Sequence, residues 1–287
     1  MKHAYLVLAH KCDRTFNTLL HLLDHEQNDI FVHMDQKNKD FDPGSIILEK
    51  SKVYYPDKRI KVNWGGYSQI KAELLLLAKA YSIGGYGYYH LLSGEDLPIK
   101  KTKEILDFWD KNNGKEFVAF DKKEFIDHDR VDYYYFFQDK IGRERHYVLR
   151  KLDQIGVYLQ KRFGLRRNSD IRFQKGANWF SISNSLAGYV LSMEGWIQET
   201  FQYTLCCDEV FLQTIVINSA FKDRLYHGGF DNDYRAIMRL VDWQRGQPYT
   251  FREEDFQELA SSDKLFARKF QADVDERIIK RVEEYLQ

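Results

Sequence analysis

The chain has 287 residues, of which 44% are hydrophobic and 30% are charged, so a sizeable core is expected and intrinsic disorder is not. Because 43 Lys and Arg residues balance 43 Asp and Glu residues, the formal net charge is zero, which argues against a protein that binds nucleic acid by bulk electrostatics. No apolar run approaches the ~20 residues that a membrane span requires, and the run near the N-terminus is too short for a signal peptide.

The first predicted elements form a β-α-β unit. Ala4–Ala9 is an apolar strand, and Arg14–Asp24 shows the spacing of an amphipathic helix. Asn28–Met34 is a second strand, which ends at Asp35. This order implies parallel strands joined by a right-handed crossover. The residues that follow the two strands, His10 and Asp35, are therefore expected at one edge of the sheet.

A glycine pair and a second helix come next. Short strands are predicted at 52–55 and 61–63, and the second leads into Trp64-Gly65-Gly66. Paired glycines let the backbone turn tightly or approach a ligand closely. Ser68 is placed to cap a helix over Gln69–Ser82, whose dense leucines and alanines indicate burial between layers.

The stretch Tyr86–Lys100 is expected to be the organising element of the chain. Tyr88–Leu92 predicts a buried strand that breaks into the polar turn Ser93–Asp96. Polar groups at the carboxyl end of a buried strand lie where open α/β sheets bind ligands. The adjacent carboxylates Glu95 and Asp96 should diverge rather than chelate an ion. For this fragment alone, an ordinary surface turn is an equally good interpretation.

The other elements follow in chain order. Helices are predicted over Lys103–Lys111, Val148–Phe163, Leu186–Met193, Glu253–Ala260, Asp263–Phe270 and Asp275–Leu286. Strands are predicted over Glu116–Phe120, Arg224–Tyr226 and Ile237–Trp243, and after the loop that begins at Lys175, whereas Val210–Ile217 fits either a helix or a strand. Composition changes after Asp121, but no Pro/Gly/Ser linker intervenes, so one elaborated domain is expected.

Several common catalytic signatures are missing from the sequence. It contains no Walker loop, GxGxxG, HExxH or GxSxG motif. It also has no D-x-D triplet at a predicted strand end, the usual way in which a sugar-transfer enzyme holds a divalent ion on a nucleotide diphosphate. Glu209 is the leading candidate for a general base, since a carboxylate with apolar neighbours at a helix start can be oriented and partly desolvated. Spacing alone favours the simpler interpretation that Asp208 and Glu209 satisfy a helix N-terminus.

Cations near the C-terminus are candidates for binding a diphosphate. Arg268 and Lys269 stand side by side in an apolar frame, and Arg245 is a further cation of this kind. They could neutralise a leaving diphosphate as a metal would, although a carboxylate ion pair is the commoner arrangement. Asp35 could accept hydrogen bonds from a nucleoside or could be an ordinary loop residue.

Aromatic and sulfur-containing residues complete the candidates. Aromatic residues make up 15% of the chain, and the tryptophans beside turns could stack on a sugar, although each is more often a core residue; these are Trp64, Trp179 and Trp243. The nine histidines show no ligand spacing and are assigned to packing or to the surface. The three cysteines lack metal-type spacing, and two of them are adjacent, so a reduced cytoplasmic setting is inferred.

Seven segments, in this order, resemble the core-2/I-branching β-1,6-N-acetylglucosaminyltransferase family, which also contains the peptide O-xylosyltransferases. They are YLVLAHK, DIFVHMD, VNWGGYSQIKAELLLLAKA, YYHLLSGEDLPIK, KGANWFSIS, CDEVFLQT and SDKLFARKF. The resemblance runs along nearly the whole chain. The region Lys122–Arg172, which helps to form the acceptor site in the family, gives no secure match.

The resemblance implies a GT-A-like (Rossmann-like) α/β fold with a mixed, mainly parallel sheet flanked by helices. It implies one glycosyltransferase domain over residues 1–287, with a nucleotide-sugar-binding half at 1–121 and an acceptor-binding and catalytic half at 122–287. The implied reaction is inverting, metal-independent transfer of a sugar from a UDP-sugar to an acceptor glycan. Neither a metal nor another cofactor is expected, in line with the missing D-x-D.

The resemblance also implies roles for single residues. Glu209 matches the catalytic base, and Lys269 matches the lysine that binds the donor diphosphate. Arg245 matches the arginine partner of that lysine, with Arg268 as the alternative because the spacing differs. The nucleoside is expected to contact Ala9, His10, Asp35, Trp64 and Ser68. The donor sugar or the acceptor is expected to contact Ser93, Glu95, Asp96, Asn178, Trp179, Asp208 and Trp243.

The expected substrates follow from the same resemblance. UDP-GlcNAc is the default donor, and UDP-xylose, UDP-glucose or UDP-galactose would fit the same frame. Because the chain lacks the N-terminal anchor and the disulfides of animal members, it is expected to be a cytoplasmic bacterial member that builds surface polysaccharide on an oligosaccharide or lipid-linked acceptor. Peripheral association with the inner face of the membrane is left open. A non-catalytic saccharide-binding module on the same fold is the second hypothesis, and a sugar nucleotidyltransferase is disfavoured because the loop after Ala9 has no glycine.

Overall fold

The computed structural model describes residues 1–142 and 146–287. Its strands are β1 (Lys2–Ala9), β2 (Asn28–Met34), β3 (Lys52–Tyr54), β4 (Tyr86–Ser93), β5 (Asp96–Pro98), β6 (Phe117–Val118), β7 (Phe180–Ser183), β8 (Arg239–Val241) and β9 (Phe266–Arg268). Its α-helices are α1 (Arg14–Leu22), α2 (Ser68–Ile83), α3 (Thr102–Lys111), α4 (His128–Asp132), α5 (Gln138–Ile141), α6 (Tyr147–Arg162), α7 (Asn184–Ser192), α8 (Glu194–Phe201), α9 (Phe211–Ile217), α10 (Phe256–Ser261) and α11 (Glu276–Leu286). None of these helices is long and apolar enough to cross a membrane.

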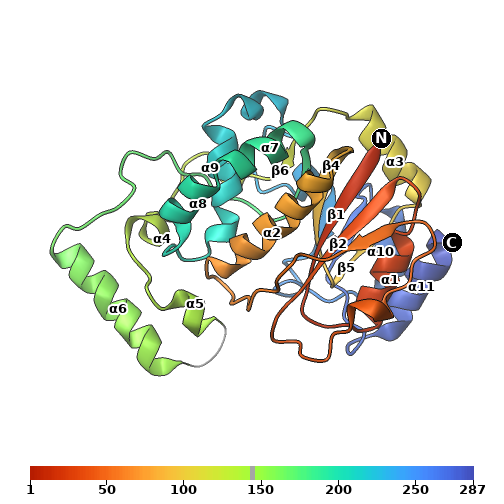
Figure 1. Cartoon of the computed structure of the whole chain (residues 1–287), viewed down its shortest axis with the longest axis horizontal. Helices are drawn as coiled ribbons and strands as arrows, with labels where there is room; N and C mark the ends of the chain where they lie inside the picture. Colours follow the sequence, from red (N-terminus) through yellow and green to blue (C-terminus); the bar gives the residue numbers. More distant parts are fainter. Residues whose placement is uncertain (143–145) are drawn as a thin grey trace.

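A six-stranded sheet in the order β3-β2-β1-β4-β7-β6 lies between α2 on one side and α1 and α11 on the other (Figure 1). Strands β3, β2, β1 and β4 are parallel, whereas β7 is antiparallel to both β4 and β6. A smaller sheet has the order β5-β9-β8. The expected α/β architecture, a mixed and mainly parallel sheet flanked by helices, is therefore confirmed.

The alternation of side chains along β1 divides the core into two layers. Leu6 packs with leucines of α2 and with residues of α7, α8 and α9 on one face of the sheet. Tyr5 and Val7 pack on the other face with residues of α1, α3 and α11. Since neighbouring side chains of a strand point to opposite faces, a strand covered by helices on both sides reads as a continuous apolar run.

Two predictions for the C-terminal part were wrong. Residues 263–270 were expected to be helical, but Phe266–Arg268 forms β9, which pairs with β5 and β8. Pairing partners remote in the chain override the local spacing, because β9 buries Phe266 and Ala267 between the small sheet and the core. Arg224–Tyr226 was expected to be a strand, but a 3₁₀ turn ends at Arg224 and only one bridge joins Leu225 to Glu116.

Two smaller corrections concern the segment before α2. Residues 61–63 join no strand. Ser68 is the first residue of α2 and not its N-cap. The N-cap is Tyr67, and the Ser68 amide donates instead to the Asp139 carboxylate of α5 at 3.0 Å. The ambiguous segment Val210–Ile217 is helical as α9.

The region after β6 contains three helices that stand apart from the sheet. α4, α5 and α6 lie at the end of the molecule that is remote from β1 and β2 (Figure 1). The predicted helix at Val148–Phe163 is confirmed as α6, within one residue at each end, while α4, α5 and α8 were not anticipated. Short helices with few apolar repeats give a weak sequence signal.

Candidate active site

A cavity of about 750 Å³ opens at the carboxyl ends of β1 and β2. It is lined by segments from both halves of the chain, and its walls include Ala9, His10, Asp35, Trp64, Gln69, Glu73, Asp121, Lys175, Asn178, Trp179, Asp208, Glu209, Tyr234, Trp243 and Arg268. A second hollow of about 720 Å³ shares His10, Asp35 and Trp64 and continues over residues 37–40. The two together form a groove at the position predicted from strand order.

The ends of β1 and β2 are joined as the β-α-β pattern predicts. The Asp35 amide donates to the carbonyl oxygen of Ala9 at 2.8 Å. The Asp35 carboxylate accepts from the Lys37 amide at 2.9 Å, and the Asn38 side chain donates to the His10 carbonyl at 3.3 Å. These bonds fix the polar loop at residues 35–38, which borders the groove. Asp35 itself is buried.

Ser68 does not line this cavity. Its hydroxyl accepts from the Asn63 amide at 2.9 Å and donates to the Asp139 carboxylate at 2.8 Å. It therefore joins the loop before α2 to α5. Trp64, in that loop, lines the cavity and has 48% of its surface exposed.

Glu209 lies in a 3₁₀ turn, Cys207–Glu209, that precedes α9. Its side chain is 38% exposed, and its Oε2 lies 2.8 Å from Nη1 of Arg130 and 3.9 Å from Nζ of Lys175. Lys175 also contacts Asp121, at 2.9 Å. Two cations thus orient an accessible carboxylate at the cavity wall, the arrangement that a positioned proton acceptor needs.

Gly176 allows the loop that contains Lys175 to pack closely against the backbone of Ala119, just after β6. Its amide donates to the Glu209 carbonyl at 3.0 Å. A Cβ at this position would lie 1.9 Å from the Ala119 carbonyl oxygen, so only glycine allows the approach.

Two buried carboxyl groups also line this cavity. Asp208 is 6% exposed and accepts from the Gln69 side chain at 2.7 Å. Burial, together with the charge of Glu209, raises the pKa of Asp208 to about 7. Glu73, on α2, is 2% exposed, and neither of its carboxyl oxygens has a hydrogen-bond partner within the part of the chain that the structure describes. Burial, and secondarily Asp208, raises the pKa of Glu73 well above its ordinary value.

Glu73→Gln is expected to flatten the pH dependence of stability. A carboxyl whose folded-state pKa is raised stabilises the fold fully at low pH, and that contribution is lost as the pH rises towards the folded-state value. Glutamine keeps the shape and removes the titration. Urea unfolding at about pH 5 and about pH 8 should therefore show a smaller decrease in free energy of unfolding for the variant than for the wild type.

The exposed Glu284 supplies the matched control for this comparison. Glu284→Gln should keep the wild-type difference between the two pH values. An equal difference in all three proteins would show that Glu73 does not titrate as its burial implies.

Trp179 lies against two guanidinium groups on the other side of the cavity. The carbon atoms of the Arg239 and Arg268 guanidiniums lie 4.7 and 4.8 Å from its ring centroid. Both arginines donate to Asp96, Arg239 at 2.6 Å and Arg268 at 2.8 Å. Arg239 and Asp96 are buried, whereas Arg268 also lines the cavity.

The predicted turn Ser93–Asp96 holds Arg268, which donates hydrogen bonds to the Ser93 hydroxyl and the Asp96 carboxylate. Asp96 accepts from the Ser93 amide at 2.9 Å and is fully buried. Glu95 lies 3.2 Å from Nζ of Lys269 and 3.6 Å from Nη2 of Arg268. The two adjacent carboxylates were expected to diverge, but both pair with Arg268. Ser93, Glu95, Asp96 and Lys269 are absent from the cavity walls.

Arg245 is held away from the cavity. Its guanidinium pairs with Asp242, and it lies 2.6 Å from both Asp255 and Glu258. The commoner alternative for this cation, a carboxylate ion pair, is what the structure contains. Its neighbour Trp243 does line the cavity.

Sequence reasoning missed several residues of the cavity walls and their supports. These are Gln69, Glu73, Asp121, Arg130, Lys175, Tyr234 and Arg239. For Gln69 and Glu73 a signal existed, because their i, i+4 spacing places both on one face of α2. The others meet through contacts between segments far apart in the chain.

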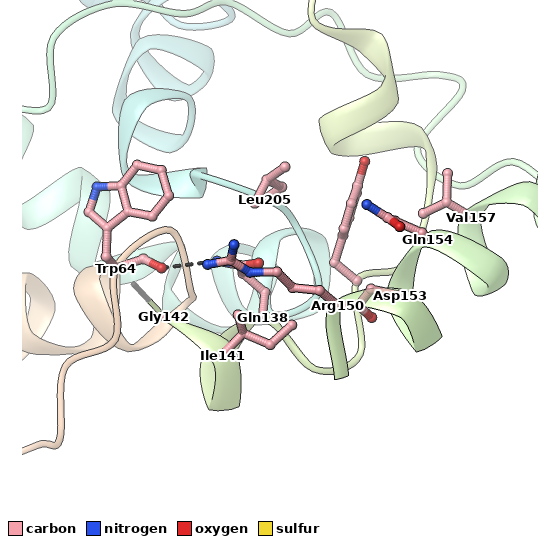
Figure 2. A pocket seen from close by; sticks show the side chains of 10 residues that line it. Trp64, Gln138, Ile141, Gly142, Arg150, Asp153, Gln154, Val157 and Leu205 are labelled. Atoms are coloured by element: carbon pink, nitrogen blue, oxygen red, sulfur yellow. Dashed lines mark hydrogen bonds between the residues drawn. The ribbon is translucent and has the colours of Figure 1, made fainter. Parts of the chain in front are cut away.

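A separate pocket of about 420 Å³ lies beside Trp64, between that residue and helices α5 and α6 (Figure 2). The Gln138 side chain donates to the Trp64 carbonyl at 3.0 Å, and Arg150 and Asp153 of α6 also line the pocket. Trp64 therefore borders both this pocket and the main cavity. Across residues 1–142 and 146–287, no group of three or more His, Cys, Asp or Glu side chains could hold a metal ion.

Comparison with known proteins finds one matching family and several similar xylosyltransferases. The model of the Core-2/I-Branching enzyme family matches residues 3–262. Human xylosyltransferase 2 is 25% identical over 306 residues, covering 99% of this chain and 33% of that protein. Xylosyltransferase sqv-6 of Caenorhabditis elegans is 27% identical over 276 residues, covering 88% of this chain and 31% of that protein. The chain thus spans about a third of the length of these curated relatives. Among solved structures, the apo form of mouse xyloside xylosyltransferase 1 matches with a TM-score of 0.39 and 11% identity, covering 93% of this chain and 96% of that one.

Proposed function

Because the chain belongs to the Core-2/I-Branching enzyme family, we propose that it is an inverting glycosyltransferase that moves a sugar from a UDP-sugar to a hydroxyl group of an acceptor glycan. The observation that carries this proposal is a single cavity that contains the β1 and β2 ends, the cation Arg268 and the accessible carboxylate Glu209. Each is the type of group that one part of the reaction requires. The ends of parallel strands accommodate the nucleotide, the cation faces the leaving group and the carboxylate accepts a proton.

In this proposal Glu209 removes the proton from the acceptor hydroxyl. The resulting oxygen nucleophile attacks the anomeric carbon on the face opposite the diphosphate, and the bond from that carbon to the diphosphate oxygen breaks. The product is a β-linked sugar from an α-linked donor, and UDP leaves with the bonding electron pair. Oriented by Arg130 and Lys175, the Glu209 carboxylate needs little rearrangement to act.

Arg268 is the arginine that we assign to the diphosphate. It lines the cavity, while Arg245 is enclosed by three carboxylates. Lys269 follows directly and is paired with Glu95, so it could reach a diphosphate only by leaving that partner. A fixed cation can stabilise the departing charge without a divalent ion, and we therefore propose a metal-independent reaction.

Two UDP-sugars should be tested first as donors. UDP-GlcNAc follows from the family resemblance, and UDP-xylose follows from the names of the curated relatives; UDP-glucose and UDP-galactose complete the set. We propose an oligosaccharide or lipid-linked glycan as acceptor, in the synthesis of surface polysaccharide in the cytoplasm.

Release of UDP from one of these four donors is expected, with transfer to oligosaccharides from a cell extract detected by mass spectrometry. Activity should be the same in EDTA as in buffer with added manganese. Strict dependence on manganese would contradict the metal-independent reaction. No UDP release from any donor, with or without acceptor, would indicate the saccharide-binding alternative.

A further inference from the structure

Helix α6 buries polar side chains and exposes apolar ones, the reverse of an ordinary surface helix. Its buried residues are Asp153 and Gln160. Asp153 accepts from the Phe137 amide at 3.2 Å, and the Gln160 amide group forms bonds of 2.8 and 3.1 Å with the backbone of Tyr134. Polar side chains thus attach the helix to the protein, whereas a surface helix normally packs through apolar ones.

The outward face of α6 is apolar and aromatic. Val148, Leu152, Ile155 and Leu159 follow the i, i+4, i+7, i+11 spacing of one helical face. Large hydrophobic side chains along the helix and the turn after it are between 44% and 72% exposed: Tyr147, Val148, Leu152, Ile155, Tyr158, Leu159, Phe163 and Leu165. A contiguous exposed surface of this kind marks an interaction site. In Figure 1 the helix lies at the extreme end of the molecule, away from the sheet.

Charge identifies the kind of surface that this face fits. Residues 147–166 contain five basic residues and one acid. Lys161 and Arg166 pair with Asp129 and Asp132, and Arg150 borders the pocket beside Trp64, which leaves Lys151 and Arg162 for the outward side. Two copies of the helix would bring like charges together, whereas an anionic surface would complement them. Aromatic and aliphatic side chains interspersed with Lys and Arg are typical of helices that lie in the interface of a bilayer.

We propose that α6 and the turn that follows it, through Leu165, bind an anionic lipid surface. The apolar side chains would enter the headgroup region, while Lys151 and Arg162 would contact lipid phosphates. The opposite side of α6, with Arg150 and Asp153, borders the pocket beside Trp64 (Figure 2). Bound in this way, the helix would hold that pocket and the adjoining active-site cavity near the membrane, within reach of a lipid-linked acceptor; that last point rests on the proposed function.

The test is co-sedimentation of the full chain with vesicles of phosphatidylcholine alone or with phosphatidylglycerol added. Binding should be at least about tenfold stronger to the anionic vesicles and should weaken as salt is raised. The double variant Lys151→Gln/Arg162→Gln should bind the anionic vesicles at least about tenfold more weakly than the wild type. The double variant Tyr158→Ser/Phe163→Ser should weaken binding by a similar factor. UDP release does not enter this measurement, so its outcome is separate from that of the proposed function.

Matched controls use exposed residues remote from α6. Lys50→Gln and Val274→Ser should bind anionic vesicles as the wild type does. Equal binding to both vesicle types, no binding, or binding unaffected by the α6 variants would overturn the proposal. A lipid-free dimer that Tyr158→Ser/Phe163→Ser dissociates would also overturn it, because a second copy would then cover the helix.

Discussion

Replacing Glu209 by glutamine is expected to lower the rate of sugar transfer by about 10³-fold while leaving UDP binding unchanged. Glutamine has nearly the same shape and can still accept the hydrogen bond that Arg130 donates at 2.8 Å. It cannot take a proton from an acceptor hydroxyl. The loss should therefore fall on the chemical step, measured as UDP release in the presence of acceptor, and UDP affinity by calorimetry should match that of the wild type.

Glu194, an exposed carboxylate on α8, provides the control for this experiment. Glu194→Gln should retain full activity, and circular dichroism should show all three proteins folded. If Glu209→Gln kept more than about a tenth of the activity, the role of general base would have to pass to another group. The nearest carboxyls that line the cavity are Asp208 and Asp121, each of which contacts a side chain that supports Glu209 or its turn.

Asp96→Asn is expected to lower the free energy of unfolding by about 3–5 kcal/mol. Asp96 is fully buried and is the counter-charge for Arg239, which is also buried, at 2.6 Å. It also pairs with Arg268 at 2.8 Å. Asparagine would remove the carboxylate that pairs with the buried Arg239, whereas Arg268 would keep Glu95 at 3.6 Å. Because burial already lowers the pKa of Arg239, to about 10, the lost partner should cost far more than a surface ion pair.

Urea unfolding followed by circular dichroism measures this difference. Asp107→Asn is the matched control, since Asp107 is exposed and pairs with Lys103 one helical turn away. It should change the free energy of unfolding by less than about 0.5 kcal/mol. A loss below about 1 kcal/mol for Asp96→Asn would show that Arg239 finds other compensation, and would remove the structural role assigned to the turn Ser93–Asp96.

The two carboxylates illustrate why position, rather than residue type, decides a role. Both Glu209 and Asp96 contact arginines, yet Glu209 is 38% exposed at a cavity wall and Asp96 is fully buried behind it. An exposed carboxylate is available to a substrate, whereas a buried one acts on the arginine that it orients. Glu209→Gln should therefore lower the rate of sugar transfer with little effect on folding. Asp96→Asn should mainly lower the free energy of unfolding.

The sequence by itself determined the elements whose signal is local. Continuous apolar runs predicted β1, β2 and β4, helical spacing predicted α1, and dense leucines and alanines predicted α2. Helices were also predicted at α6 and α11, with ends close to those observed. The order of β1, α1 and β2 was enough to place His10 and Asp35 at one sheet edge. These features follow from neighbours in the chain, because strand alternation and helical repeat are properties of a few consecutive residues.

Only the tertiary structure decided which groups face one another. β9 was mistaken for a helix because its partners, β5 and β8, are remote in the chain. The bond from Arg239 to Asp96 joins residues 143 positions apart, and three carboxylates enclose Arg245 while Arg268 reaches the cavity. The outward apolar face of α6 was equally hidden, since a helical repeat shows that a face exists but not which side the protein covers. The physical reason is the same in each case: burial and charge pairing depend on distances in space, and spacing along the chain does not specify them.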